Sequence, residues 1–500
     1  MNFMRRHLTK SVNRETCSPI SFDCRRLLSL FNQYVQAQNN DDKDTILYNT
    51  LPYFCKVFHD AQPVDFVDKF PDIHIFCARV SQLFVREIKA RAANKSSGTI
   101  ILVCFTFFLE EGGLTIAQFL EPDENVGDCL EVTDYEHAVI TNKGSYLLNS
   151  LNLMSTGHTS LIECMTAASV PSTLVKCLYI FLDLPEKYST RCTFHTKFRE
   201  LLQRLCLYPV VAEELARKDA LCHLFNALTD WCAPHNACWR VTATVVLSTI
   251  AQNSLTPVVT KCIHDSECIC HSLKNLSESK SGSKDFVNSF VSLLHVVRES
   301  STDDQILLDD FRSNNGYLVL SDFCLKLEEN RCPDSENSLK TLVALVGHLA
   351  ICGPVELRPK AGAGEQIHKI PGFHIYMPKT EARKSVRNMY AFDVLQSLFN
   401  RSSTNHLSLL VLKTVQSIFL QDLANYFILE QQNILVVFAK KIFEKSYEIQ
   451  EAYFDLLEAL VNKLHYVFMK EISSIVVQMK LFKLLFRIEE LLNIELYVNH

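Results

Sequence analysis

The sequence predicts an all-α fold, an armadillo- or HEAT-like helical solenoid in which paired helices stack into an α-α superhelix. Three observations support this prediction. The chain has 500 residues, of which 48% are hydrophobic, so it can bury the core of an extended repeat array. It has only 13 glycines and 15 prolines, too few turn residues for a many-stranded β protein of this length. Apolar residues also recur at helical spacing from end to end.

Apolar stripes identify individual helices. Residues spaced by three and four positions fall on one face of a helix, and such a face must pack against a neighbour. The three clearest stripes are Phe194, Phe198, Leu201, Leu202 and Leu205; Phe392, Leu395, Leu398 and Phe399; and Tyr453, Leu456, Leu457, Leu460, Leu464 and Val467. In the third stripe, Glu451, Asp455, Glu458 and Asn462 form the polar face. Residues 174–184 and 434–438 are apolar nearly all round, as expected of an inner helix.

The run 305–328 predicts an αα-hairpin. ILLDDFR is followed by Asn314, Asn315 and Gly316, which can end a helix, and then by YLVLSDFCLKLE. A helix, a stop and a second helix form the unit from which solenoids are built. No fixed repeat length is visible in the sequence, so the repeats are degenerate.

The domain organisation follows from composition. Residues 1–20 are expected to be a disordered or weakly ordered N-terminus, 21–470 a repeat domain, and 471–500 a terminal helix or divergent tail. Within the domain, 98–135 is a possible insertion, and 121–135, 277–284 and 353–384 are expected loops. The final segment, 472–498, is apolar enough to leave part of a stripe uncovered if a natural continuation is missing.

Charge and targeting signals limit the function. The net charge of −6 is small for this length and gives no global attraction to nucleic acid. No apolar segment that would make a secretory signal follows the basic residues near the N-terminus, so we expect a cytoplasmic protein. In that compartment the 19 cysteines act as small buried hydrophobes. The apolar run 100–109 is too short to span a bilayer, and we expect it either to pack against other helices as a buried segment or to stand apart as an unusual insertion.

One cysteine and histidine cluster is a candidate zinc site. KCIHDSECICH contains Cys262, His264, Cys268, Cys270 and His271. Structural zinc needs four converging ligands, usually in two pairs on two segments. Here the spacing is irregular and all five residues lie in one segment. We therefore favour buried or half-buried residues at a helix end over a zinc site.

A second cluster lies in DWCAPHNACW, which contains Cys232, His235 and Cys238. Pro234 and Asn236 predict a turn between two helices. The only two tryptophans, Trp231 and Trp239, flank it, so a packed corner is favoured over a ligand site.

Catalytic motifs are missing from the sequence. It contains no G-x-S-x-G, no P-loop, no G-x-G-x-x-G turn and no H-E-x-x-H. The acidic pairs Asp303 with Asp304 and Asp309 with Asp310 suit helix starts or solvated faces. The basic residues of the long loop and the following helix are interpreted as solvated, with a contact to an acidic partner or a lipid headgroup as the alternative; they are Arg358, Lys360, Lys369, Lys379, Arg383, Lys384 and Arg387.

Six collinear segments resemble a known family. They are REIKARAANKS (86–96), VPSTLVKCLYIFLDLP (170–185), AEELARKDALCHLFNAL (212–228), LLDDFRSNNGYLVLSDFCLKLE (307–328), SVRNMYAFDVLQ (385–396) and ANYFILEQQ (424–432). They are similar to the N-terminal, armadillo-like region of the Alfy-type, autophagy-linked members of the BEACH family, large scaffolds with WD repeats and a FYVE domain. The resemblance is interrupted at 98–114 and ends after residue 476.

The resemblance implies a scaffold domain in selective autophagy or membrane traffic, with no enzyme activity, no cofactor and no metal. Other proteins are the expected partners, bound through the solenoid surface. No nucleic acid and no direct membrane span are expected, and peripheral membrane association would need modules absent from this chain. The alternative is a metal-dependent enzyme or zinc-binding protein that uses the cluster from Cys262 to His271.

Overall fold

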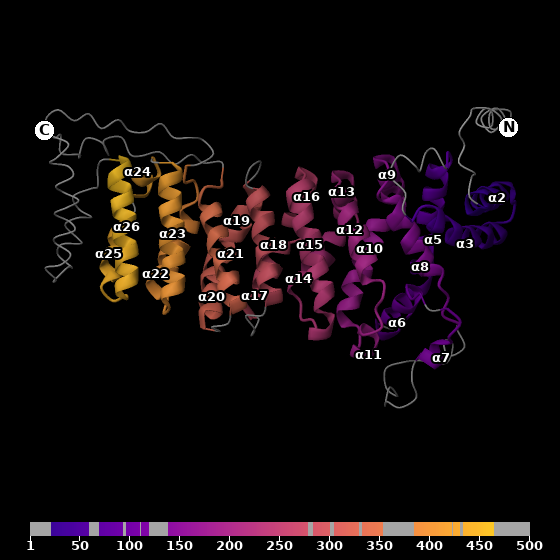
Figure 1. Ribbon diagram of the computed structural model, residues 1–500, viewed down its shortest axis with the longest axis horizontal. Coiled ribbons are helices and arrows are strands. Elements are labelled where there is room, and N and C mark those ends of the chain that lie inside the picture. The colour runs from indigo at the N-terminus through magenta and orange to yellow at the C-terminus, as the bar shows by residue number, and fades with distance from the viewer. Residues whose placement is uncertain are drawn as a thin grey trace. The chain divides into compact units, whose positions relative to one another are not determined.

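The computed structural model describes residues 22–59, 70–93, 97–110, 112–119, 139–278, 284–300, 305–329, 333–353, 385–422, 424–430 and 434–464 (Figure 1). These residues form helices throughout, apart from their connections and one isolated antiparallel bridge between Thr115 and Val139. The predicted all-α fold is therefore confirmed for the described residues.

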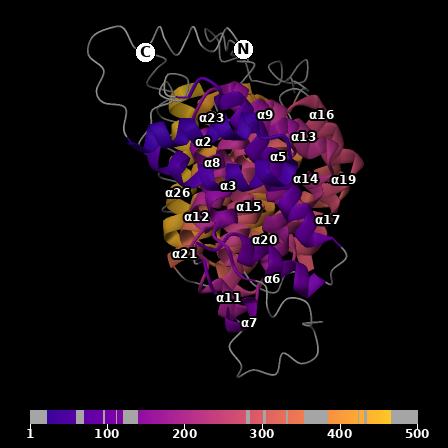
Figure 2. The same ribbon diagram turned by 90° about the vertical axis from the view of Figure 1, so that its right-hand side faces the viewer.

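The chain divides into two compact units. The first unit consists of residues up to Ala220, together with Cys232–Trp239. Figure 2 shows α2, α3, α5 and α8 of this unit side by side. Its elements are α2 (Phe22–Gln36), α3 (Asn40–Val57), α5 (Ile73–Ala92), α6 (Ser97–Phe107), α7 (Ile116–Phe119), α8 (Lys143–Met154), α9 (Thr159–Ala167), α10 (Val170–Ile180), η1 (Phe181–Asp183), α11 (Glu186–Ser189), α12 (His195–Leu205), α13 (Pro209–Arg217) and η2 (Pro234–Asn236).

The second unit consists of Leu221–Trp231 and the residues from Arg240 onward. Within it, each helix packs mainly on helices one to three places away along the chain, so the packing advances stepwise. Its elements are most of α14 (Ala220–Thr229) and α15 (Ala237–Asn253), then α16 (Pro257–Asp265), α17 (Cys268–Glu278), α18 (Lys284–Ser300), α19 (Ile306–Ser313), α20 (Gly316–Glu329), α21 (Pro333–Ala350), α22 (Met389–Arg401), α23 (Asn405–Gln421), α24 (Ala424–Glu430), α25 (Ile434–Ile442) and α26 (Tyr447–Leu464).

The apolar run 100–109 lies in the core of the first unit. Most of it forms α6, which packs on α5, α8 and α10. Phe108 stacks on Phe194 with ring centroids 5.0 Å apart, and the buried Trp239 lies 4.9 Å from Phe181 in the same aromatic cluster. Of the two outcomes expected for this run, packing against other helices is confirmed. Among the described residues, no single helix is both long and apolar enough to cross a bilayer; only the bent pair 159–167 and 170–183 has the required length and composition.

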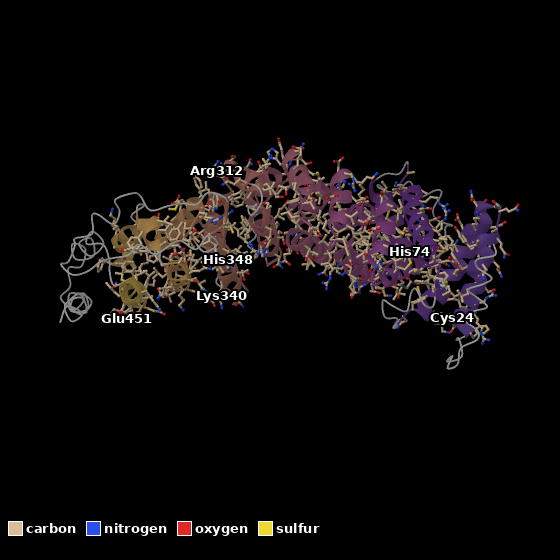
Figure 3. The ribbon with its side chains drawn as sticks, turned by 90° about the horizontal axis from the view of Figure 1, so that it is seen from above. Cys24, His74, Arg312, Lys340, His348 and Glu451 are labelled. Carbon is tan, nitrogen blue, oxygen red and sulfur yellow. The ribbon has the colours of Figure 1, made fainter. Side chains whose placement is uncertain are left out.

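The predicted apolar stripes are buried. All residues of the stripes at 194–205 and 392–399 are buried, as are Tyr453, Leu456, Leu457 and Leu460. Helix α21 shows the complementary solvent face. Lys340 and His348, labelled in Figure 3, are exposed and eight residues apart, while Leu342, Val346 and Leu349 on its other face are buried. Helical periodicity therefore placed the core correctly in these segments.

A regular interval that is not visible in the sequence appears in the backbone. Among the described residues, four other than glycine adopt the left-handed conformation, namely Ser169, Asp219, Glu267 and Asn315. Their intervals are 50, 48 and 48 residues, and each lies between a short helix and the next one, at the α9–α10, α13–α14, α16–α17 and α19–α20 turns. One long-range hydrogen bond has the same separation: Ser292 Oγ donates to the carbonyl of Thr244, 48 residues earlier.

Buried carboxylates connect helices that are far apart in sequence. Glu214 of α13 accepts hydrogen bonds from the backbone N–H and the hydroxyl of Ser172, in the first turn of α10. In the second unit, Glu328 of α20 accepts from the N–H groups of Ser403 and Thr404, where α23 begins. The first N–H groups of a helix have no partner within it, so these carboxylates supply the missing acceptors.

Several predicted segments lie outside the described residues. The expected disordered N-terminus is 1–20, and two of the expected loops are 121–135 and 354–384. The second of these loops carries most of the basic run. The expected uncovered C-terminal stripe falls within 471–500. Of the third predicted loop, Ser277 lies in the last turn of α17 and Lys284 is the first residue of α18, while 279–283 lie outside the described residues.

Candidate interaction groove

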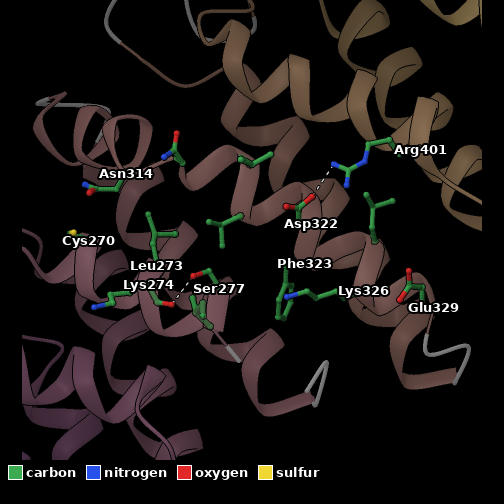
Figure 4. Close-up of a pocket in the computed structure, with 15 residues that line it drawn as sticks. Cys270, Leu273, Lys274, Ser277, Asn314, Asp322, Phe323, Lys326, Glu329 and Arg401 are labelled. Atoms are coloured by element: carbon green, nitrogen blue, oxygen red, sulfur yellow. Dashed lines mark hydrogen bonds and ion pairs between the residues drawn. The ribbon is translucent and has the colours of Figure 1, made fainter. Parts of the chain in front are cut away.

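The second unit has a groove of about 610 Å³ beside α17, α20 and Arg401 of α22 (Figure 4). The αα-hairpin predicted at 305–328 builds one side of it. Asn315, with φ of 58°, reverses the chain between α19 and α20. Gly316 is the first residue of α20. The close approach of the backbone requires glycine there, because a Cβ would lie 2.6 Å from the carbonyl oxygen of Phe311. The left-handed residue is therefore Asn315, while Gly316 permits a close backbone approach.

The groove has an apolar base. It is lined by Leu273, Leu276, Leu318, Val319, Phe323 and Leu325. Leu276 and Phe323 are buried, whereas Leu318 is 57% exposed. A single exposed leucine is common on protein surfaces, but Leu318 continues a buried apolar surface out to solvent. Such a surface gains free energy when another apolar side chain covers it.

Charged side chains surround this base. Arg401 Nη1 lies 2.8 Å from Asp322 Oδ1, an ion pair that joins α22 to α20. Lys274 and Lys326 also line the groove, and Glu329 lies at its edge. Figure 4 shows the Lys326 side chain directed towards Phe323. With Asp322 paired to Arg401, two lysines and one glutamate remain, so the lining carries a net positive charge.

A smaller cavity of about 200 Å³ lies beside α19 and the start of α22. Asn388 Nδ2 donates to the Tyr317 hydroxyl at 2.7 Å, and burial raises the pKa of Tyr317 to about 12. Arg312 lies over the Tyr390 ring, 5.4 Å from its centroid. A phenol with this pKa stays neutral at physiological pH. The hydrogen bond of Tyr317 with Asn388 links α20 to the start of α22.

The candidate zinc residues do not converge. His264 Nδ1 lies 2.9 Å from Asp310 of α19, Cys268 Sγ lies 4.0 Å from Cys222, and Cys270 lines the groove. Positions two apart on a helix are about 200° apart around its axis, so this spacing directs the side chains to different faces. In the described part of the chain, no three histidine, cysteine or acidic side chains gather closely enough to hold a metal ion.

The second cluster forms a hydrogen-bonded corner. His235 Nε2 donates to the carbonyl of Leu184 at 2.9 Å, and the Asn236 amide donates to the carbonyls of Leu182 and Leu184. Trp239 is fully buried, as a packed corner requires. Trp231 departs from that prediction because it is 76% exposed.

The other charged candidates have structural contacts. Asp309 forms an ion pair with Arg312, and Asp310 accepts from His264. Arg387 is the one residue of the basic run within the described ranges, and its guanidinium donates to the carbonyl of Gly353 at 2.8 Å. Asp303 and Asp304 lie outside those ranges.

Sequence reasoning did not identify the groove. Its residues come from three segments, around 270–277, 314–329 and 401, and each looks like an ordinary helix when taken alone. The only local signal is Leu318, which lies outside the buried stripe of Leu320, Phe323 and Leu327 on α20. A pattern that assigns the core cannot also show where two exposed helix faces form one surface.

The chain matches no protein-family profile. Among solved structures, an engineered protein is similar over 92% of both chains, with 11% sequence identity and a TM-score of 0.37, which is too low to support an argument.

Two curated proteins are similar in sequence. The WD repeat- and FYVE domain-containing protein 4 of Mus musculus is 28% identical over 333 residues, which cover 65% of this chain and 10% of that protein. The Homo sapiens protein of the same name is 27% identical over 337 residues, 66% of this chain and 10% of the relative. This chain thus spans about a tenth of their length. The comparison relates this chain to WD repeat- and FYVE domain-containing proteins.

Proposed function

We propose that this chain is a non-catalytic interaction scaffold and that its groove binds an acidic, amphipathic segment of a partner protein. The observation that carries the proposal is the apolar base from Leu276 to the exposed Leu318, next to Lys274 and Lys326. Apolar side chains of the partner would cover the base, and its carboxylates would pair with the lysines. The apolar contacts supply most of the affinity, while the charges select the partner.

The wider setting is proposed from the resemblance and the relatives. The chain would be an armadillo-like solenoid over 21–470, corresponding to the N-terminal region of an Alfy-type protein. It would act in the cytoplasm, in selective autophagy or membrane traffic. The recurring interval of 48 to 50 residues between left-handed turns supports a repeat array. The names of the relatives support a large multidomain protein of which this chain is one part.

The test is selection of binding peptides with the full chain as bait. The expected consensus has aspartate or glutamate beside apolar residues at helical spacing. Leu318→Asp should weaken binding of the selected peptides about tenfold or more, because a charge would then face an apolar surface. Val258→Asp is the matched control, since Val258 is similarly exposed at 50% but lies on α16 and does not line the groove.

A charge exchange tests direct contact. Lys326→Glu should weaken the binding of an acidic peptide. A peptide in which lysine replaces the acidic residue should bind this variant again. If Lys326→Glu loses binding and no charge-reversed peptide restores it, Lys326 acts only on the fold. Peptides that bind equally well to wild type and Leu318→Asp would place the interaction elsewhere and refute the groove.

A further inference from the structure

Cys77 on α5 and Cys164 on α9 are neighbours in the first unit. The helices lie side by side (Figure 2) and pack directly on each other. The thiol of Cys77, fully buried on α5, lies 3.5 Å from the carbonyl oxygen of Leu161 on α9. Cys164 follows Leu161 by three residues, so it lies one turn further along the same face. It is half-buried and interacts with both Cys77 and His74.

Hydrogen bonds at the start of α9 orient His74. His158 Nδ1 accepts from the backbone N–H of Ser160 at 3.3 Å and lies 3.0 Å from its hydroxyl oxygen. His158 Nδ1 is therefore an acceptor, and the Ser160 hydroxyl can donate to it. The same oxygen lies 3.4 Å from His74 Nδ1 and can accept the proton of that nitrogen.

The surroundings favour the thiolate of Cys164. A hydrogen bond from Cys77, followed by the charge and hydrogen bond of His74, lowers the pKa of Cys164 to about 6, against the opposing effects of partial burial and Glu163. Cys77 and His74 on α5 and Glu163 on its own helix are the charged or titratable groups that act on it. Cys164 lies in the last turn of α9, where the helix dipole disfavours an anion, so the stabilisation comes from α5.

Cys77 has the opposite character. Its hydrogen bond with Cys164 and its burial raise its pKa, so it stays protonated at physiological pH. The pair thus combines a half-exposed thiolate with a buried thiol in contact with it. The thiolate is the nucleophilic form of cysteine, so Cys164 is the member that reacts first.

We propose that Cys164 is a modification site for hydrogen peroxide, that Cys77 resolves the oxidised sulfur, and that His74 is a positioning residue. The Cys164 thiolate attacks one peroxide oxygen, so that an S–O bond forms, the O–O bond breaks and hydroxide leaves. The sulfur of Cys77 then attacks Cys164; an S–S bond forms, and the oxygen leaves as water with the Cys77 proton. The two thiols lose two electrons, which reduce the peroxide to water.

The test is peroxide treatment of the full chain followed by peptide mapping by mass spectrometry. The expected product is a disulfide between the Cys77 and Cys164 peptides. In Cys77→Ala, dimedone should instead trap a sulfenic acid at Cys164. In Cys164→Ser, Cys77 should stay reduced. A sulfenic acid at Cys77 in Cys164→Ser would reverse the assigned roles and overturn the proposal.

Cys222 and Cys268 provide a matched control, because their sulfurs are 4.0 Å apart in the second unit. At pH 7 a thiol of pKa about 6 is mostly ionised, so iodoacetamide should label Cys164 about tenfold faster than Cys222. If Cys222 and Cys268 oxidise as readily as the α5–α9 pair, or if Cys164 is labelled no faster than Cys222, proximity alone explains the chemistry and the proposal fails.

The pH profile separates activation from folding. Labelling of Cys164 should rise with a midpoint near pH 6 in the wild type, because the thiolate forms above its pKa. The midpoint should move upward in Cys77→Ala and in His74→Gln. His74 is exposed, so His74→Gln should keep the fold. An unchanged midpoint in both variants would show that neither side chain activates Cys164.

Discussion

The carboxylate of Glu328 lies 2.6 Å from the hydroxyl of Thr404, which precedes α23 by one residue, and it also accepts from the backbone N–H groups of Ser403 and Thr404. On the other side of the same turn, Lys445 Nζ donates to the carbonyl of Ser402, at the end of α22. An anion at a helix start and a cation at a helix end both complement the helix dipoles. The α22–α23 turn is therefore held by two charges from α20 and the segment before α26.

Replacing Glu328 should destabilise the second unit. Glu328→Ala leaves the N–H groups of Ser403 and Thr404 without this acceptor, and we expect a cost of about 3 kcal/mol. Glu328→Gln retains one acceptor oxygen and should cost about 1 kcal/mol. Urea denaturation gives the global effect, and hydrogen exchange of α23 locates it. Glu329→Ala, an exposed neighbour, is the control. Equal stability of Glu328→Ala and this control would contradict the capping role.

Glu214 should make the first unit pH-sensitive. Burial raises the pKa of Glu214 above its ordinary 4.5, although its hydrogen bonds with Ser172 oppose the shift. Because the folded-state pKa is higher than the unfolded one, the contribution of this group to stability is full below pH 4.5. It declines as the pH rises through the folded-state pKa.

The measurement compares wild type with Glu214→Gln over a pH series. The amide in this variant does not titrate, so the stability of wild type relative to the variant should fall from pH 4.5 upward and then become constant. Urea midpoints at each pH give the difference, and other titrating groups cancel. Glu213→Gln, which lies beside Glu214 and removes a carboxylate 3.8 Å from Arg217, is the control. A difference that rises with pH would reverse the assigned direction.

Gly144 should not tolerate a side chain. A Cβ at Gly144, in the first turn of α8, would lie 2.0 Å from the carbonyl oxygen of Phe107, at the end of α6. The oxygen belongs to the backbone and cannot rotate away, so the helices must move apart, at a cost of roughly 2–3 kcal/mol. Gly98 provides the opposite case, since a Cβ there meets nothing within 4 Å. Gly98→Ala should be neutral or stabilise by up to about 1 kcal/mol. Denaturation of both variants checks the contrast, and equal effects would contradict the α6–α8 contact.

The sequence predicted the helices well because their main signal is local. The stripe from Phe194 to Leu205 lies within three turns of one helix, so spacing alone identifies its buried face. For the apolar run at 100–109, its length argued against a membrane span, but only the packing of α6 on its neighbours decided between a buried segment and a separate insertion. The interval of 48 to 50 residues was not found in the sequence, because a backbone conformation marks it and no residue type does. The residues that adopt this conformation are Ser169, Asp219, Glu267 and Asn315, four different types without the glycine that usually signals a left-handed turn.

The sites depended on contacts that a sequence does not encode locally. Cys164 and Cys77 are 87 positions apart, and only the packing of α9 on α5 brings them together. The two cysteine and histidine clusters were close in sequence, but neither converges on one point. The residues around Cys262 face different directions, and those around Cys232 support a turn. Closeness along a helix is a poor guide to convergence, because neighbouring residues point to different sides.

The left-handed turns provide the last prediction. Glu267, with φ of 51°, is exposed, and its backbone N–H and carbonyl both form hydrogen bonds with neighbouring turns. A left-handed residue with a Cβ costs about 1–2 kcal/mol, whereas glycine avoids that strain but loses more entropy on folding. Glu267→Gly should therefore stabilise the second unit by about 0.5–1 kcal/mol.

Asn315→Gly is the matched variant, because Asn315 has φ of 58° at the left-handed turn that comes 48 residues later. Asparagine tolerates this conformation better than glutamate, so the gain should be close to zero. Urea midpoints of the two variants and wild type, measured together, give the order. If Glu267→Gly is less stable than wild type, or if both variants gain equally, backbone strain is not what distinguishes these turns, and the side chain of Glu267 contributes to stability in its own right.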